Sequence, residues 1–339
     1  MSSSHLPAPP APGMLALRVH AVRAEARDVL SIELRDAAGG PLPPFTPGAH
    51  LEITLPTGAG GQPALVRHYS LCNSAAETHR YVVAVGLAAT SRGGSLAVHE
   101  QLRVGQVLQV RPPRNHFELG NGAAHYRFIA GGIGITPILS MLRWCEAHGQ
   151  PWSLLYCTRS RVRTAFYEEL RAHGPKVQFH FDDEAGGQPA DLAGALSNAV
   201  QGEHIYCCGP APLMRAVQAA SAQREPGTVH FEWFSAGEPA PASQSLPATT
   251  ESGFEIVLAS SGQRLQVAPG QSILDTLEQH GIGVPFACRE GLCRTCETGL
   301  CGGEADHRDL VLSDAERAAH KTILLCVSRA KSAVLELDL

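Results

Sequence analysis

Apolar and polar residues alternate in short runs over the first third of the chain. The clearest runs are HLEIT at 50–54 and RYVVAVGL at 80–87, and clusters of Gly and Pro separate them from their neighbours. A period of two places every second side chain on the same face of a strand. The pattern therefore predicts an antiparallel barrel or sandwich that occupies residues 14–122.

The pattern changes at Tyr126. Short apolar strands such as YRFIAGG, WSLLYC, VQFHF and HIYCCG then alternate with helical stretches such as ITPILSMLRWCEAHG and APLMRAVQAASAQ. Strands that are separated by helices predict a parallel α/β sheet. We assign this second domain to residues 123–236.

A third segment follows a run with almost no large apolar residue. This run, AGEPAPASQSLPATTES, begins at Ala236, and we interpret residues 237–252 as a linker. After it, FEIVLASSGQRLQV predicts a hairpin, and SILDTLEQHG predicts a helix that ends at Gly281. Residues 253–339 thus form a small third domain, and residues 1–13, rich in Ser, Pro and Ala, are predicted to be a disordered leader.

The composition is that of an ordinary globular protein. The 339 residues, 44% of them apolar, suit two or three domains with cores of their own. The net charge of -5 gives no reason to expect nucleic-acid binding, and no run reaches the ~20 apolar residues that span a bilayer. Ten cysteines are spread along a chain whose start lacks the apolar core of a signal peptide, so we expect reduced thiols and a cytoplasmic protein.

Four cysteines in the third domain have the spacing of an iron-sulfur site. They form C-x4-C-x2-C with a distant fourth member, the arrangement of plant-type [2Fe-2S] clusters: Cys288, Cys293, Cys296 and Cys326. Four thiolates would also satisfy a structural zinc ion, but the spacing favours the cluster. Cys301 is a further candidate thiol, for which a core or surface position is the simpler interpretation.

Two segments of the first domain carry groups that suit a flavin nucleotide. Arg67-His68-Tyr69-Ser70 lies at the end of a predicted strand, and the loop Arg92-Gly93-Gly94-Ser95 follows. A flavin phosphate needs fixed cations and close backbone N–H groups, and the ring needs an aromatic wall and a hydrogen-bond partner. The tyrosine could instead be an ordinary alternating strand residue.

A glycine-rich turn in the second domain fits a dinucleotide. The segment AGGIGITP places Gly131, Gly132 and Gly134 between a strand and a predicted helix that opens at Thr136. Glycines let the backbone approach a pyrophosphate, and proline begins a helix without losing a hydrogen bond. The segment CGP at 208–210, at a later strand end, weakens the alternative of a turn without a ligand.

The order of these motifs resembles the phthalate dioxygenase reductase family, which includes vanillate demethylase reductases. The motifs R-x-Y-S-L, R-G-G-S, A-G-G-I-G-I-T-P, C-G-P and the cysteine cluster follow one another over nearly the whole chain after the leader. The resemblance implies an antiparallel β-barrel flavin domain, an α/β parallel-sheet NAD-binding domain and an α+β β-grasp [2Fe-2S] ferredoxin domain, in that order. It also implies electron transfer from NADH to a Rieske-type oxygenase component, and we expect the reductase to be a monomer.

The same resemblance implies roles for the flavin residues. Arg67 and His68, with the loop from Arg92 to Ser95 (Arg92, Gly93, Gly94 and Ser95), would bind the flavin, and the phosphate would lie at Arg67 and the loop. Tyr69 would lie against the ring and Ser70 near its N5 atom. The cofactor is typically FMN in this family, although relatives that share R-x-Y-S use FAD.

On the nicotinamide side, the resemblance places Cys208 and Gly209 near the ring and Thr136 near both flavin and nicotinamide. Phe234 would cover the flavin until NADH displaces it, although it could equally be a core aromatic residue. The expected reaction is hydride transfer from NADH to the flavin, followed by transfer of single electrons to the cluster. The residues at the reacting atoms would then be Ser70, Thr136, Cys208 and Phe234.

Several alternatives stay open. Arg159, Arg161 and Arg163 offer guanidinium groups that could bind the 2′-phosphate of NADPH, although the resemblance favours NADH. The chain could also be the reductase of a diiron or other oxygenase. A redox carrier or sensor is the alternative outside the enzymes.

One residue of the cluster motif departs from the family pattern. Relatives usually read C-G-x-C where this chain has Cys293-Arg294-Thr295-Cys296, so arginine replaces the residue that tolerates unusual backbone angles best. We predict a more positive cluster environment with a raised potential. A docking role for Arg289 or Arg294 towards an acidic partner surface is a second interpretation.

Overall fold

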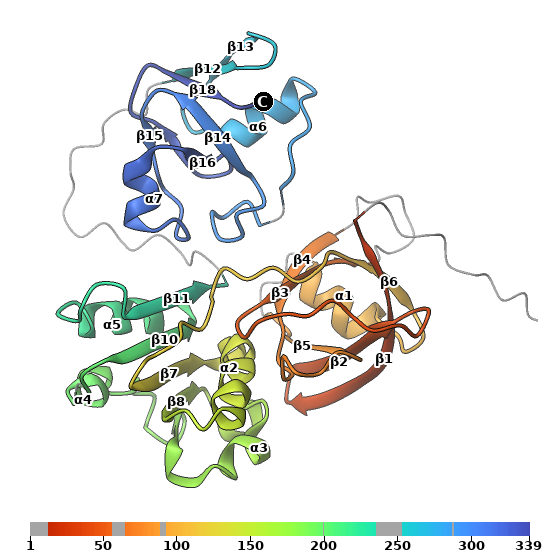
Figure 1. Ribbon diagram of the computed structural model, residues 1–339, viewed down its shortest axis with the longest axis vertical. Coiled ribbons are helices and arrows are strands. Elements are labelled where there is room, and N and C mark those ends of the chain that lie inside the picture. The colour runs from red at the N-terminus through yellow and green to blue at the C-terminus, as the bar shows by residue number, and fades with distance from the viewer. Residues whose placement is uncertain (1–12, 56–64, 89–92, 199, 235–252, 287) are drawn as a thin grey trace, which may run out of the picture. The chain divides into compact units, whose positions relative to one another are not determined.

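The computed structural model describes residues 13–55, 65–88, 93–198, 200–234, 253–286 and 288–339. Its contacts divide the chain into two compact units, the first ending at Glu232 and the second beginning at Trp233. In Figure 1 the first unit combines a curved antiparallel sheet with a layered α/β domain, and the second is a smaller mixed sheet with two helices. No helix in the described ranges is long and apolar enough to cross a membrane.

The first part of the first unit is a barrel. Its elements are β1 (Leu15–Ala26), β2 (Val29–Asp36), β3 (His50–Leu55), β4 (Leu65–Ser70), β5 (Tyr81–Gly86), α1 (Gly94–Gln101) and β6 (Val107–Val110). The antiparallel strands lie in the order β4-β3-β6-β1-β2-β5, and a bridge between Leu71 and Val83 joins the two ends. The alternating pattern buries Leu17, Val19 and Leu51 completely, so the predicted antiparallel barrel is confirmed.

The second part is the parallel α/β domain. Its strands are β7 (His125–Gly131), β8 (Trp152–Thr158), β9 (Val177–Phe181), β10 (Glu203–Gly209) and β11 (Val229–Trp233). Its helices are α2 (Ile135–Ala147), α3 (Tyr167–Arg171), α4 (Leu192–Leu196) and α5 (Ala211–Ala220), with 3-10 turns η1 (Gly132–Gly134), η2 (Arg161–Arg163) and η3 (Gly174–Lys176). The sheet order is β11-β10-β7-β8-β9, and the pairs from β10 to β9 are parallel, as predicted.

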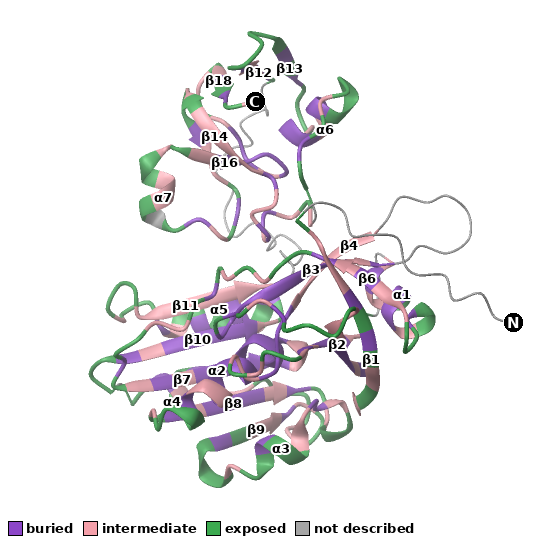
Figure 2. Cartoon of the chain, turned by 45° about the vertical axis from the view of Figure 1, so that its right-hand side comes forward, coloured by how far each residue is buried: buried purple, intermediate pink, exposed green. Residues whose placement is uncertain are grey.

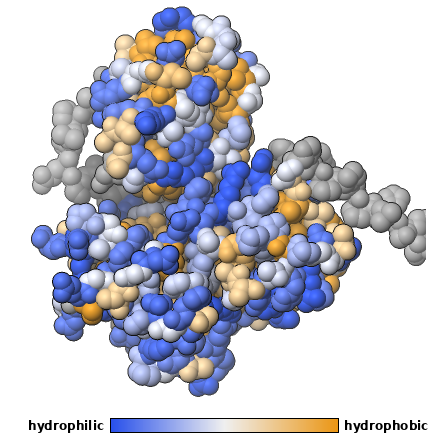
Figure 3. Space-filling model, viewed as in Figure 1, coloured by the Kyte–Doolittle hydropathy of each residue, from blue (hydrophilic) through white to orange (hydrophobic). Residues whose placement is uncertain are grey.

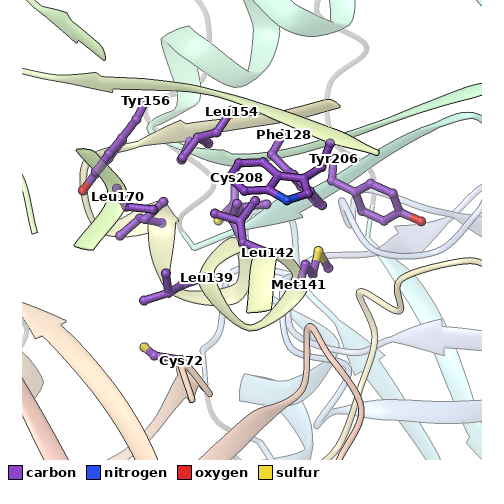
Figure 4. Packing of buried hydrophobic residues seen from close by; sticks show 14 of the residues in the cluster. Cys72, Phe128, Leu139, Met141, Leu142, Leu154, Tyr156, Leu170, Tyr206 and Cys208 are labelled. Atoms are coloured by element: carbon purple, nitrogen blue, oxygen red, sulfur yellow. The ribbon is translucent and has the colours of Figure 1, made fainter. Parts of the chain in front are cut away.

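A shared apolar core joins the barrel to the α/β domain. Cys72 and Phe117 belong to the same buried cluster as Leu139, and Figure 4 shows Leu139 of α2 pointing towards Cys72. Figure 2 shows buried residues along β7, β8 and β10. Figure 3 shows that the described residues on the visible face of the first unit are mainly hydrophilic. The Ser140 hydroxyl oxygen also accepts a hydrogen bond from the Gly48 N–H at 3.0 Å. This packing fixes the end of β4 relative to the carboxyl edge of the parallel sheet.

The second unit has a β-grasp arrangement. Its elements are β12 (Phe254–Leu258), β13 (Arg264–Val267), α6 (Ile273–Gln279), β14 (Glu297–Gly302), β15 (Ala305–Asp306), α7 (Asp314–Ala319), β16 (Thr322–Leu324), β17 (Arg329–Ala330) and β18 (Val334–Leu337). The main sheet has the order β13-β12-β18-β14-β16, with β12 and β18 parallel, and β15 pairs with β17. The Ser272 hydroxyl caps α6, whose Ile273, Leu274 and Leu277 are fully buried.

Local predictions for the second unit are confirmed. The hairpin is β12 and β13, which pair antiparallel, and the helix is α6, which ends just before Gly281 at φ 73°. The linker at 237–252 and the leader up to residue 12 lie outside the described residues. The division between residues 122 and 123 stays a prediction.

Candidate functional site

The predicted phosphate-binding residues meet at the start of α1. Gly93, at φ 88°, turns the chain into the helix, which begins at Gly94. A Cβ atom on Gly94 would come within 2.5 Å of the Arg67 Nε atom, so the guanidinium of β4 lies against the first turn of α1. A cation beside a helix N-terminus is suited to a phosphate. Arg92, also predicted here, lies outside the described residues.

Tyr69 and His68 of β4, both predicted to bind the flavin, have different surroundings. Tyr69 packs against the barrel core, and burial raises the pKa of its phenol to about 12, so it stays neutral. The His68 Nε2 atom instead lies 3.5 Å from Glu52 Oε2, and the His68 ring centroid lies 5.0 Å from that of His50. The described contacts of His68 are thus with the barrel, and its role towards a flavin stays a prediction.

The end of β4 meets the parallel sheet through a serine and a glutamate. Ser70 is buried, and its hydroxyl donates a hydrogen bond to Glu232 Oε2 of β11 at 3.4 Å. Burial raises the pKa of the Glu232 carboxyl to about 8, and the Ser70 hydrogen bond opposes part of this shift. The carboxyl is therefore mostly protonated at neutral pH.

The fully buried Cys208 lies near Glu232, close to the end of β10. Burial raises the pKa of its thiol well above the usual range, and ionisation of the nearby Glu232 would raise it further. Ser70, Cys208 and Glu232 thus form one constellation of neutral, polar side chains at neutral pH. The sequence predictions included Ser70 and Cys208 but missed Glu232, for which the signal was a carboxyl inside an apolar strand.

The predicted glycines mainly permit close packing. A Cβ on Gly134 would lie 2.3 Å from the Cys208 carbonyl oxygen, and a Cβ on Gly209 would lie 2.9 Å from Gly131 Cα. The turn η1 is therefore pressed against the end of β10. Gly132, by contrast, has no heavy atom within 4 Å of the position of an added Cβ, so this glycine faces open space.

Two other predicted residues have contacts that leave their roles untested. Thr136, in the first turn of α2, is buried, and its hydroxyl donates to the Ile133 carbonyl oxygen at 3.0 Å. Phe234 follows β11 and is 40% exposed, unlike a core aromatic residue. Its proposed place over a flavin ring stays a prediction.

Two of the three candidate arginines after β8 are engaged with carboxylates, and the role of the exposed Arg159 stays a prediction. Arg161 Nη2 lies 3.1 Å from Glu184 Oε1, and the Arg161 guanidinium stacks 4.8 Å from the centroid of the Phe181 ring. Arg163 is paired with Asp28 of the barrel. The positive charges of Arg161 and Arg163 are thus compensated, which makes them poor binders of the extra phosphate of NADPH.

The four predicted cluster cysteines come together in the second unit. Hydrogen bonds from the thiols of Cys293 and Cys326 lower the pKa of the Cys288 thiol, and a hydrogen bond from the Cys326 thiol lowers that of Cys296. Backbone N–H groups of Glu290 and Leu292 donate to Cys288 Sγ at 3.3 and 3.4 Å. Thiolates surrounded by N–H donors suit an iron-sulfur cluster.

The burial of the remaining cysteines of the second unit agrees with an iron-sulfur site. Cys293, Cys296 and Cys326 are buried, whereas Cys301 is exposed on β14, which fits its interpretation as a surface thiol. No group of three or more Cys, His, Asp or Glu among the described residues is arranged around a single metal ion. The fit of the cluster therefore rests on the donor chemistry of the four thiols and their N–H partners.

Comparisons with known proteins match both units. Residues 256–331 match the family described as 2Fe-2S iron-sulfur cluster binding domain, and residues 106–228 match the N-terminal domain of the dimethylamine monooxygenase subunit DmmA-like family. Phenoxybenzoate dioxygenase subunit beta from Ectopseudomonas oleovorans is 46% identical over 96% of this chain and 97% of its own length. Phthalate dioxygenase reductase from Burkholderia cepacia is 40% identical over 96% of this chain and 98% of its own.

Solved structures give the same result. A phthalate dioxygenase reductase, described as a modular structure for electron transfer from pyridine nucleotides to [2Fe-2S], has a TM-score of 0.69 and 40% identity, covering 96% of this chain and 98% of its own. An intact type IV self-sufficient cytochrome P450 monooxygenase has a TM-score of 0.84 and 39% identity over 96% of this chain. This chain spans only 41% of that longer protein.

Proposed function

The chain belongs to the phthalate dioxygenase reductase family and is an oxidoreductase, and on that premise we propose that it is the reductase component of a Rieske-type oxygenase system. It would take a hydride from NADH onto a flavin and deliver single electrons to the oxygenase through a [2Fe-2S] cluster. The observation that carries the proposal is the meeting of the barrel and the parallel sheet at Ser70, Cys208 and Glu232. This meeting supports the proposal that the flavin and the nicotinamide would approach each other at that point.

The residues around this point support a division of roles. Arg67 and the first turn of α1 would bind the flavin phosphate, and Tyr69 would provide an apolar wall for the ring. The Ser70 hydroxyl would hold a hydrogen bond at the ring nitrogen that accepts the hydride. The protonated Glu232 can hold a proton next to this hydroxyl, within the hydrogen bond that the two side chains already form.

On the sheet side, the turn η1 and Gly209 would bind the coenzyme at the carboxyl edge of β7 and β10. The neutral thiol of Cys208 would contact the nicotinamide without adding a charge that competes for the hydride. Since Arg161 is already paired with Glu184, we propose NADH rather than NADPH as the coenzyme. Family resemblance supports FMN rather than FAD, and a monomeric reductase.

The cluster would be held by Cys288, Cys293, Cys296 and Cys326, whose mutual contacts fit this donor set. When bound, the cluster supplies one-electron transfer to a partner. The loop would supply N–H groups to the sulfur of Cys288, as it already does for the thiol.

A second acceptor is favoured by one observation. The module within the self-sufficient cytochrome P450 monooxygenase matches this chain with a TM-score of 0.84. A separate P450-type monooxygenase is therefore a candidate partner in place of a Rieske-type oxygenase. Product formation with each purified oxygenase, driven by this chain and NADH, distinguishes the two.

The proposal is tested by removing the cluster alone. In the Cys326→Ser variant we expect NADH still to bleach the flavin, while electron delivery to the oxygenase falls by at least about tenfold. Cys301→Ser, which changes an exposed thiol of β14, is the matched control and should behave like the wild type. The flavin released by heat should be FMN by mass. Normal oxygenase turnover with Cys326→Ser would contradict the assignment of the cluster ligands.

A further inference from the structure

The loop that carries three cluster cysteines (residues 288–296) contains two residues other than glycine in the left-handed backbone region, Arg289 at φ 59° and Arg294. Arg294, between Cys293 and Cys296, has φ 55°. This left-handed region is rarely occupied by residues other than glycine, because the Cβ atom crowds the following carbonyl. Such a conformation persists only where surrounding contacts hold it.

The Arg294 guanidinium makes several directed contacts. Its Nη2 atom donates to both carboxylate oxygens of Glu316, at 2.9 and 2.8 Å, and to the Val311 carbonyl oxygen at 2.9 Å. Nη1 lies 3.4 Å from Glu297 Oε2. The arginine side chain is 19% exposed and the Glu316 side chain is 42% exposed, so the ion pair is only partly shielded from water.

Glu316 is itself fixed in place by the start of α7. It is the third residue of a capping box, in which Glu316 Oε2 accepts from the Ser313 N–H at 2.7 Å and from the Ser313 hydroxyl at 2.8 Å. Burial opposes ionisation of Glu316, but its bonds to Ser313 and Arg294 outweigh burial and lower the pKa of the carboxyl. It is therefore a carboxylate at neutral pH.

Hydrogen bonds also fix the segment that leads into α7. Asp309 Oδ1 accepts from the N–H groups of Val311 and Leu312, and Arg317 donates to the carbonyl oxygens of Asp309 and Leu312. We call residues 309–317 the platform. The platform contacts the cluster loop at a second point, where the Leu310 N–H donates to the Gly291 carbonyl oxygen at 3.2 Å.

We propose that Arg294 is a positioning residue that fastens the cluster loop to the platform, and so fixes the sulfur atoms of Cys293 and Cys296. This inference rests on the proposed function, since it assumes that the four cysteines bind the cluster. It replaces the two roles predicted for Arg294 from the sequence, whereas the docking role predicted for Arg289 stays a prediction. Because Glu316 and Glu297 compensate the arginine, its charge is available neither to raise the cluster potential nor to attract an acidic partner.

The proposal is tested with Arg294→Gly, Glu316→Gln and the double variant in the full-length protein. Arg294→Gly relaxes the backbone but removes the fastening, and Glu316→Gln removes the charge while glutamine can keep the capping box. Arg264→Gln is the matched control, because it removes an arginine that pairs with Glu255 in the same unit and leaves Arg294, Glu316 and the capping box intact. The readouts are the electron paramagnetic resonance spectrum of the reduced cluster and the rate at which an iron chelator bleaches its visible absorption.

We expect Arg294→Gly to shift or broaden the resonance and to accelerate bleaching about tenfold or more, with a smaller change of the same sign for Glu316→Gln. The double variant should be no worse than Arg294→Gly, because both changes break one contact. Arg264→Gln should keep the wild-type resonance and the wild-type bleaching rate. Wild-type spectra and bleaching rates in both single variants, or additive effects in the double variant, would overturn the proposal. A wild-type protein without a cluster signal would instead overturn the proposed function.

Discussion

Glu232 is the residue whose chemistry departs most from what its type suggests. A carboxyl in an apolar strand next to a buried thiol is costly to ionise, which is why its pKa rises to about 8. Its protonated form accepts the hydrogen bond from the Ser70 hydroxyl without a negative charge, whereas a carboxylate would place a negative charge beside the proposed site of hydride transfer. The sequence offered only a weak signal for this residue, a carboxyl inside an apolar strand, because its burial depends on how β11 packs.

This pKa predicts how stability depends on pH. The folded state keeps a proton on Glu232 that the unfolded chain releases above its ordinary carboxyl pKa of 4.5. The stabilising contribution is thus complete below pH 4.5, declines as the pH rises, and is lost once the pH passes about 8. Glu232→Gln cannot ionise, so we expect its melting temperature to fall less than that of the wild type between about pH 5 and pH 9.

Glu255→Gln is a suitable control for this measurement. Glu255 is paired with Arg264 in the second unit, and hydrogen bonding to this arginine lowers the pKa of the carboxyl, the opposite direction to Glu232. Its removal should not flatten the alkaline part of the profile. Parallel pH profiles for wild type and Glu232→Gln would show that Glu232 does not titrate near pH 8.

At the scale of elements, the proposed coenzyme site depends on how closely η1 approaches the end of β10. The glycine pattern was readable from the sequence, and the strand, turn and helix that it predicted are β7, η1 and α2. The reason for the glycines was only partly predictable. The sequence favoured close approach of the backbone to a pyrophosphate. The structure shows that Gly134 and Gly209 allow the backbone of the β7–η1 segment to pack against the backbone at the end of β10.

Gly134→Ala tests this packing directly. The added Cβ would lie 2.3 Å from the Cys208 carbonyl oxygen, a backbone atom that cannot move aside cheaply. We expect a loss of roughly 1–3 kcal/mol in the free energy of unfolding and weaker binding of NADH. Thermal denaturation and a fluorescence titration with NADH would measure the two effects.

The matched control at this scale is Gly40→Ala. A Cβ there would lie 3.6 Å from Asp36 Oδ1, an ordinary contact distance, on an exposed turn. This variant should keep wild-type stability and NADH affinity. If Gly134→Ala behaves in the same way, the close approach of η1 to β10 does not matter for coenzyme binding.

Other elements followed from the sequence for simple physical reasons. The alternating barrel strands, the parallel strands and the helix that ends before Gly281 depend on local periodicity and turn residues, which the sequence displays. The surroundings of Arg294 did not follow, because its partner Glu316 lies 22 residues away on α7. Pairings of that range depend on how the second unit folds.

At the scale of the whole molecule, three binding segments are divided between two units. The barrel and the α/β domain share one core, so the candidate flavin and nicotinamide sites belong to one packed body. The cluster cysteines belong to the second unit, which has a core of its own. Electrons that arrive as a hydride in the first unit must therefore pass to the cluster in a second unit with a separate core.

Anaerobic mixing of the full-length protein with NADH tests whether electrons pass from NADH to the flavin and from the flavin to the cluster. The flavin absorption and the cluster absorption are followed at their own wavelengths, and the reduced cluster is confirmed by electron paramagnetic resonance. We predict that the flavin bleaches first and that the cluster is reduced afterwards, at the expense of reduced flavin. Reduction of the cluster without prior flavin bleaching, or flavin reduction that never reaches the cluster, would contradict the account.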